Sequence, residues 1–70
     1  MISNFYILIN GEPFYCMQVM SVWQLLLYLN IDCNTNLIEY NNEILDYDRL
    51  KKVMVKPSDK IEIVTLVGGG

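Results

Sequence analysis

The sequence predicts an α+β domain: a mixed sheet of four to five strands with one main helix packed on one face. Runs of β-branched and aromatic residues, separated by turn residues, are typical of strands. Apolar residues recur at helical spacing in one segment, residues 22–29. The chain has 70 residues, which is enough for one small core. One helix can cover only one face of a sheet, so we expect two layers.

A hairpin is expected near the N-terminus. Residues 5–9 are rich in aromatic and β-branched side chains and predict the first strand. Asn10 and Gly11 both tolerate a positive φ, which predicts a tight turn. The returning strand is expected over residues 14–19, with Pro13 at its start, where a missing N–H donor is tolerated.

The main helix is expected to begin at Ser21. Ser21 followed three positions later by Gln24 fits a capping box. A stripe of apolar residues at helical spacing should face the core: Val22, Leu25, Leu26 and Leu29. Trp23 and Leu27 widen this apolar face, and residues 30–34 end the helix.

Strands separated by turns are expected in the second half of the chain. The expected strands cover residues 37–41, 43–45, 53–55 and 61–66. Turns are expected at Asn41-Asn42 and over residues 56–60, and residues 47–51 indicate a helical turn. The first and last strands are neighbours in a β-grasp (ubiquitin-like) fold, which the hairpin and single crossover permit. Alternation then turns four isoleucines toward the core: Ile7, Ile9, Ile61 and Ile63.

Charge and composition argue against several classes of protein. The net charge of −3 argues against a nucleic-acid binder, and no apolar run approaches the roughly 20 residues of a membrane span. Histidine is absent, and Cys16 and Cys33 alone cannot supply a tetrahedral metal site. No nucleophile–base pair is recognisable, so we expect no enzyme. Residues 1–5 lack a signal-peptide pattern, which predicts the cytoplasm, or the plastid stroma for a plastid-encoded chain.

The sequence changes abruptly from the β-branched run 61–65 to glycine. We expect residues 1–66 to form the domain and residues 67–70 a flexible tail. No side chain crowds the carboxylate of Gly70, so this carboxylate is the expected working group. Val67, Gly68 and Gly69 would thread into the active sites of partner enzymes. A phosphate-binding loop is a poor alternative, because it needs a helix after the glycines. The other alternative is a linker remnant.

Strand alternation also predicts a docking surface. If the four isoleucines face inward, Tyr6, Leu8, Val64 and Leu66 face outward, and neighbouring strands gather them into one apolar patch. Exposed apolar patches of this kind often mark partner sites. The alternative is that these residues are scattered over the surface. We expect the free chain to be a monomer.

Four segments carry a resemblance to a known family. They are Ile9-Asn10-Gly11-Glu12, the helix with Leu25, Leu26 and Leu29, residues 38–44, and residues 59–64 running into Val67-Gly68-Gly69-Gly70. With these segments the chain resembles the ubiquitin-like sulfur carriers of the ThiS/MoaD family, most closely the ThiS carriers of thiamin biosynthesis. Two turns depart from the family pattern. Tyr40-Asn41-Asn42 stands where Arg-Asn-Gly is usual, and Ser58-Asp59 stands where Gly-Asp is usual.

The resemblance implies a carrier that binds no cofactor of its own. A ThiF-like adenylating enzyme would use ATP to join AMP to the Gly70 carboxylate. Sulfur from a donor such as a cysteine desulfurase would replace the adenylate and leave a thiocarboxylate. A ThiG-like thiazole synthase would take this sulfur to build the thiazole of thiamin. Three alternatives stay open: the small sulfur-carrier subunit of molybdopterin synthase, a ubiquitin-like protein modifier, and a plain β-grasp binding module.

Overall fold

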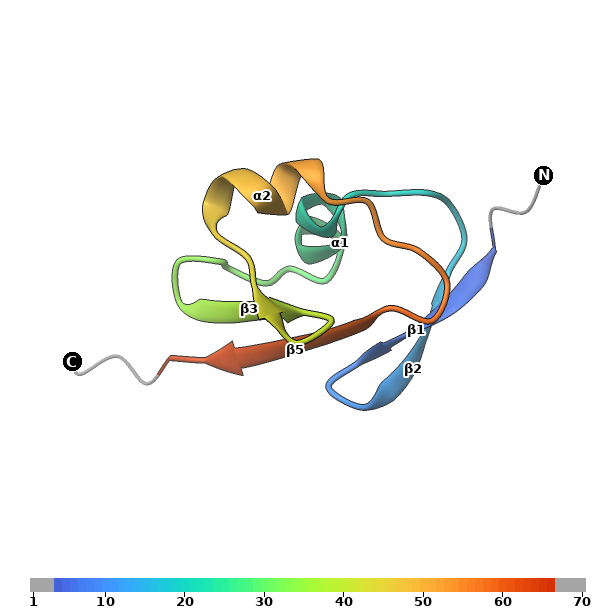
Figure 1. Cartoon of the computed structure of the whole chain (residues 1–70), viewed down its shortest axis with the longest axis horizontal. Coiled ribbons are helices and arrows are strands. Elements are labelled where there is room, and N and C mark those ends of the chain that lie inside the picture. The colour runs from blue at the N-terminus through green and yellow to red at the C-terminus, as the bar shows by residue number, and fades with distance from the viewer. Residues whose placement is uncertain (1–3, 67–70) are drawn as a thin grey trace.

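The computed structural model describes residues 4–66 of the chain. Along the chain the elements are β1 (Phe5–Ile9), β2 (Glu12–Cys16), α1 (Val22–Tyr28), β3 (Asn36–Tyr40), β4 (Glu43–Ile44), α2 (Tyr47–Lys52) and β5 (Lys60–Thr65). Figure 1 shows the two helices as one layer above a layer of strands.

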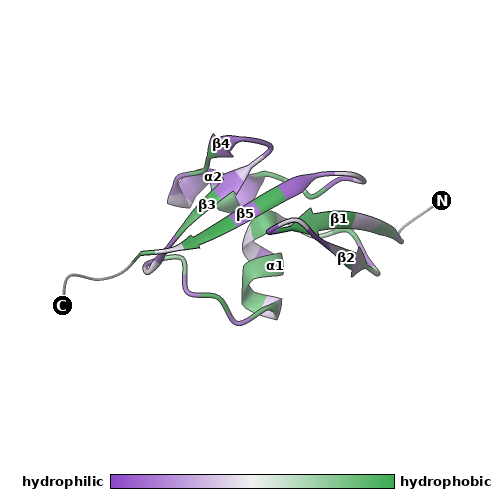
Figure 2. Cartoon of the chain, turned by 90° about the horizontal axis from the view of Figure 1, so that it is seen from below, coloured by the Kyte–Doolittle hydropathy of each residue, from purple (hydrophilic) through white to green (hydrophobic). Residues whose placement is uncertain are grey.

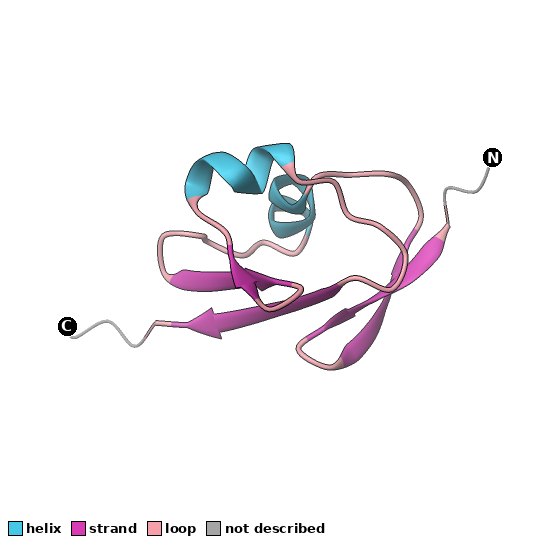
Figure 3. Cartoon of the chain, viewed as in Figure 1, coloured by secondary structure: helices cyan, strands magenta, loops and turns pink. Residues whose placement is uncertain are grey.

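Five strands form one mixed sheet in the order β2-β1-β5-β3-β4. β1 and β5 are parallel neighbours, whereas all other neighbouring strands are antiparallel. Both helices lie on the same face, so no described helix covers the other face of the sheet (Figure 3). The predicted α+β class and the β-grasp pairing of the first and last strands are therefore confirmed.

Two tight turns set the ends of the hairpins. Their residues all have positive φ: Asn10 (51°), Gly11 (81°), Asn41 (49°) and Asn42 (73°). Glycine and asparagine adopt this conformation at low cost, and a turn of this kind matches the twist of the strands that it joins. Both predicted turns are confirmed. The first turn pairs Ile9 with Glu12, so β2 covers Glu12–Cys16 and not the predicted residues 14–19.

The capping box at the start of α1 is confirmed. The Ser21 hydroxyl accepts from the Gln24 N–H at 3.1 Å, and the Gln24 side chain accepts from the Ser21 N–H at 2.9 Å. Val22, Leu25 and Leu26 are buried on the sheet side of the helix. The prediction that Leu27 widens the apolar face is wrong, because this side chain points away from the sheet and is 61% exposed.

The predicted strand over residues 53–55 is also wrong. Met54 makes one isolated bridge, to Ser21, and this segment joins no strand of the sheet. It runs instead beside the start of α1, where Val53 accepts from the Val22 N–H and Val55 donates to the carbonyl of Met20, both at 2.9 Å. The backbone of these β-branched residues is therefore paired with the residues that lead into α1 and not with a strand of the sheet.

The core lies between the sheet and the two helices. Its buried residues are Ile7, Cys16, Met20, Val22, Leu25, Leu26, Ile38, Leu45, Leu50, Val55 and Ile61. Ile9 and Ile63 face the same side and pack against this core half-buried, so the predicted inward set is confirmed with two members at its margin. Burial raises the pKa of the Cys16 thiol, which keeps it in the unreactive protonated form.

Candidate functional site

β5 carries the chain out of the domain toward the predicted tail. Every residue from Ile61 to Thr65 has a partner in β3, and the N–H of Leu66 donates to the carbonyl of Thr35 at 2.8 Å. The backbone is therefore held by hydrogen bonds up to the last described residue. The predicted working groups, Val67, Gly68, Gly69 and Gly70, lie outside the described residues.

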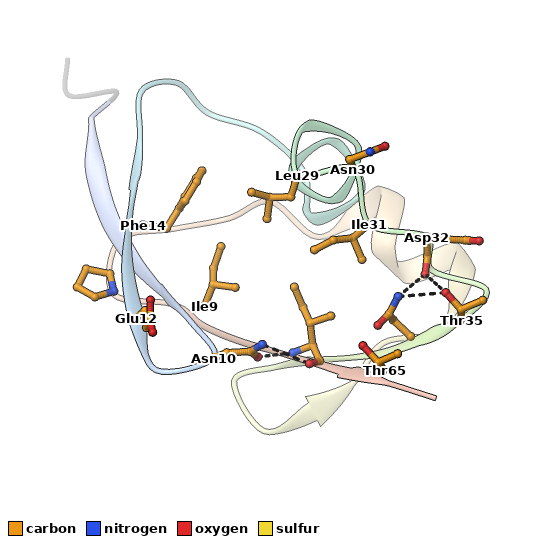
Figure 4. A pocket seen from close by; sticks show the side chains of 13 residues that line it. Ile9, Asn10, Glu12, Phe14, Leu29, Asn30, Ile31, Asp32, Thr35 and Thr65 are labelled. Atoms are coloured by element: carbon orange, nitrogen blue, oxygen red, sulfur yellow. Dashed lines mark hydrogen bonds between the residues drawn. The ribbon is translucent and has the colours of Figure 1, made fainter. Parts of the chain in front are cut away.

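The opposite edge of β5 is held by a side chain. β1 pairs with only the first two residues of β5, because β1 ends at the turn that begins with Asn10. The amide of Asn10 then takes the place of a strand residue: Oδ1 accepts from the Ile63 N–H at 2.7 Å and Nδ2 donates to the Ile63 carbonyl at 3.3 Å (Figure 4). Asn10 thus extends the hydrogen bonding along this edge of β5 from Ile61 to Ile63. The sequence signalled only the turn at Asn10, not this second role.

An open pocket of about 660 Å³ lies beyond this contact, on the inner side of the sheet. Figure 4 shows its apolar wall, made by Ile9, Phe14, Leu29 and Ile31. The hairpin tip, the end of α1 and the margin of β5 meet there. None of its polar side chains is both buried and without a hydrogen-bond partner in the part of the chain described. The pocket is therefore a hollow at the margin of the core.

A buried carboxylate, Asp59, fixes the segment that leads into β5. It accepts hydrogen bonds from the Tyr40 hydroxyl, from the Asn41 amide at 3.1 Å and from the Lys56 N–H at 2.6 Å. The Lys56 ammonium lies 3.7 Å from the same carboxylate. The side chain of Asn41 also accepts from the N–H of Lys60 at 2.8 Å. These contacts lock the β3–β4 turn to the loop before β5. Tyr40, which departs from the family pattern, therefore has a structural role.

The same contacts set the ionisation of Asp59. Burial alone would raise the pKa of its carboxyl, but the hydrogen bonds from Tyr40, Lys56 and Asn41 and the Lys56 charge outweigh burial and hold the pKa below its ordinary value. Burial and the bond to Asp59 in turn raise the pKa of Tyr40. The carboxylate is thus the favoured form in the folded chain. The folded state therefore binds fewer protons at Asp59 than the unfolded state does.

This ionisation predicts a loss of stability in acid. A carboxyl with a lower pKa in the folded state stabilises the fold fully above its unfolded pKa, and the stabilisation falls as pH drops through the folded pKa. We therefore expect the free energy of unfolding in urea to decrease below about pH 4. To isolate the contribution of Asp59, the measurement is the difference in the free energy of unfolding between the natural chain and Asp59→Asn. That difference should shrink as the pH falls; a constant difference would contradict the assignment.

The structure divides the predicted docking patch in two. Leu8 lies opposite Lys60, the first residue of β5. Tyr6 is two residues before Leu8 and Val64 is four residues after Lys60, so Tyr6 and Val64 are six positions apart along parallel strands, about 20 Å. Both side chains are exposed, at 62% and 46%. The predicted outward orientation is right, but Tyr6 and Leu8 do not adjoin Val64 and Leu66.

Each half of the predicted patch includes further apolar residues from neighbouring strands, which alternation within a single strand could not predict. The hairpin-side cluster is Tyr6, Leu8 and Tyr15, with the two tyrosine rings 4.8 Å apart between centroids. The tail-side cluster is Leu37, Ile44, Val64 and Leu66, all exposed apolar residues. Leu37 lies opposite Val64, and Ile44 lies opposite Glu39 on the same face. Figure 2 shows β5 as mostly apolar toward its C-terminal end. Leu37 and Ile44 were missed because only strand pairing shows that Leu37 lies beside β5 and that Ile44 lies on the other side of β3.

Other kinds of site find little support in the residues that are described. Between residues 4 and 66, no three His, Cys, Asp or Glu side chains come together in a way that could hold a metal ion. None of the helices in this part is long and apolar enough to cross a membrane. Cys16 and Cys33 form no disulfide, and Cys33 is half-buried against the core.

Comparison with known proteins points to one family. The model of the ThiS family matches residues 7–70. A relative from Porphyra purpurea called "Uncharacterized protein ycf40" is 40% identical over 68 residues, covering 97% of this chain and 96% of its own length. One of the same name from Trieres chinensis is 40% identical over 62 residues, covering 89% and 85%. The crystal structure of a thiamine biosynthesis protein (ThiS) from Geobacter metallireducens matches with a TM-score of 0.81 and 26% identity, over 94% of this chain and 100% of that chain.

Proposed function

Since this chain belongs to the ThiS family of sulfur carriers, we propose that it carries sulfur as a thiocarboxylate on Gly70 for synthesis of the thiazole ring of thiamin. It acts as a co-substrate, not as a catalyst. The observation that carries the proposal is the family match, which extends through Gly70. Residues 67–70 span about 13 Å when extended, enough to enter a buried active site while the domain stays outside.

The chemistry takes two steps at one carboxylate. On a ThiF-like enzyme, a Gly70 carboxylate oxygen attacks the α-phosphorus of ATP, an acyl–phosphate anhydride bond forms and pyrophosphate leaves. A hydrosulfide ion then attacks the acyl carbon, the carbon–sulfur bond forms and AMP leaves with the electrons of the carbon–oxygen bond. A thiol releases that hydrosulfide from the persulfide of a donor such as a cysteine desulfurase. A ThiG-like thiazole synthase takes the sulfur.

The names of the relatives support a proposal for the compartment. The ycf40 proteins belong to plastid genomes, which favours the plastid stroma for this chain over the cytoplasm. We propose that the adenylating enzyme, the sulfur donor and the thiazole synthase meet the carrier there.

Intact-protein mass spectrometry tests the proposal directly. The chain is incubated with ATP, a ThiF-like enzyme and a sulfide source. We expect first a mass gain equal to an adenylate, and then a gain equal to the replacement of one oxygen by sulfur. A thiazole synthase added afterwards should restore the starting mass. The proposal would be wrong if the mass did not change under conditions in which a known sulfur carrier is thiocarboxylated.

The two apolar clusters should contribute unequally to adenylation. Val64→Asn and Tyr6→Asn both place a neutral polar group on an exposed strand position, so the charge of the sheet face does not change. Val64 lies close to the tail that the enzyme must hold, whereas Tyr6 lies about 20 Å away along the strands. We expect Val64→Asn to raise KM by about 10-fold, the loss expected when one central apolar contact is removed, and Tyr6→Asn by about threefold or less. Steady-state adenylation kinetics of the two variants measure both KM values. A larger rise in KM for Tyr6→Asn than for Val64→Asn would contradict this prediction.

A further inference from the structure

Two carboxylates face each other on the open face of the sheet. Glu39 in β3 lies directly opposite Glu62 in β5. The ladder between these strands closes with bonds at Asn41–Lys60 and at Leu66–Thr35, so Glu39 and Glu62 form a hydrogen-bonded pair with Cα atoms about 5.5 Å apart. Like charges directly opposite each other on antiparallel strands destabilise a sheet. The fold alone gives no reason for this pair.

No cation within the described chain neutralises the pair. The ion pairs between residues 4 and 66 are Arg49–Glu43 at 3.1 Å and Lys56–Asp59 at 3.7 Å, and neither includes Glu39 or Glu62. The last turn of α2 holds two further basic side chains, Lys51 and Lys52, and α2 lies on the helix side of the sheet (Figure 1). Lys60 lies two positions before Glu62 in β5, on the same face, but it forms no ion pair with either carboxylate in the described part of the chain. Both carboxylates are therefore available to a cation from outside.

The pair is bordered by apolar residues toward β4 and toward the tail, and by Asn41 and Lys60 on the remaining side. Ile44 lies opposite Glu39 on one side, and Leu37 and Val64 form the adjacent row toward the tail. These residues with Leu66 are the tail-side cluster, so two negative charges sit beside exposed apolar surface. When a partner covers that surface and removes water, an attraction between opposite charges becomes stronger. The face thus places two negative charges beside exposed apolar surface, and charged pairs that a partner desolvates completely can contribute strongly to binding.

Resting on the proposed function, we propose that the tail-side cluster and the Glu39–Glu62 pair bind an apolar surface of the adenylating enzyme that presents an arginine between the two carboxylates. The partner must carry positive charge, because the pair is unneutralised. A planar guanidinium offers donors in several directions and can bridge two carboxylates, which a lysine ammonium does less well. Val64 and Leu66 directly precede the tail, so an enzyme that holds Gly70 in its active site must lie against this end of the sheet.

The test uses Glu39→Gln, Glu62→Gln and the double variant in the ATP-dependent adenylation assay. Glu12→Gln is the matched control, because it is the same chemical change at an exposed site in the N-terminal hairpin, away from this face. We expect KM to rise about 10-fold for each single variant with kcat unchanged, and the control to stay within about twofold. The salt dependence of KM should weaken in the double variant. Thermal unfolding should show the double variant equally or more stable, since a repulsion is removed.

The outcomes separate this inference from the proposed function. Unchanged KM in the double variant, while the natural chain is adenylated and thiocarboxylated, overturns the arginine contact and leaves the carrier function standing. A loss of stability that accounts for the change in KM overturns it too. If the variants affect only sulfur transfer to the thiazole synthase, the face binds that enzyme, and the proposal is wrong. If sedimentation shows a dimer of the natural chain that the variants abolish, the occupant is a second copy, and the proposal is equally wrong.

Discussion

Deleting Gly70 should reduce thiocarboxylate formation at least about 100-fold and leave the domain as stable as before. The deletion moves the carboxylate back by one extended residue, about 3.4 Å, and misplacement of a reacting group by about 1 Å already costs about 100-fold in rate. The fold should persist because the described contacts end at Leu66, where the backbone donates to Thr35. Intact-mass measurement after incubation with ATP, the adenylating enzyme and sulfide gives the rate, and thermal unfolding gives the stability.

A second variant tests whether the position of the carboxylate, and not the loss of one residue, causes the effect of deleting Gly70. Adding one glycine after Gly70 keeps every residue of the chain and displaces the carboxylate the other way. It should also be modified poorly, whereas Gly69→Ala, which keeps the length, should lose less activity. If the chain that ends at Gly69 were thiocarboxylated as fast as the natural chain, the enzyme would not require a tail of fixed length. That result would contradict the assignment of the Gly70 carboxylate as the sulfur-carrying group.

Asp59→Ala should destabilise the domain by about 3 kcal/mol. The change removes the shared acceptor of Tyr40, Asn41 and the Lys56 N–H, and donors left without partners in a buried site cost about 1–3 kcal/mol each when they cannot reach water. The Asp59 side chain is only 6% exposed, so water replaces it poorly. A domain of this length has a total stability of only about 4–10 kcal/mol, and its Tm should fall by about 12–24 °C. Urea and thermal unfolding measure both quantities.

The matched control for this prediction is Asp48→Ala. Asp48 is an exposed aspartate in the first turn of α2, and its loss should cost less than about 1 kcal/mol. A double-mutant cycle with Tyr40→Phe tests the cause of the larger effect. If the two residues act through their shared hydrogen bond, Tyr40→Phe should cost less in the Asp59→Ala background than in the natural chain. Strictly additive costs would contradict the network.

Expectations that depended on neighbours in the sequence were mostly right. The turns at Asn10-Gly11 and Asn41-Asn42, the capping box at Ser21 and the buried stripe of α1 are local structures. Their conformation depends on residues at most four positions apart, so residue type and spacing contain the needed information. The exposed Leu27 and the missing strand over residues 53–55 mark the limit of that reasoning. An apolar residue on a short helix, or a β-branched run, becomes core or strand only where a partner element lies beside it.

By itself the sequence determined the α+β class, the order of the elements, the inward and outward sides of the strands and the glycine tail after β5. Only the tertiary structure decided which outward residues are neighbours. Alternation assigns a side chain to a face of the sheet, but the register between strands distant in the sequence follows from burial of the whole core. That register separated Tyr6 from Val64, placed Leu37 beside Val64 and set Glu39 opposite Glu62. It also brought the Asp59 carboxylate, an ordinary turn residue in the sequence, into a buried set of hydrogen bonds.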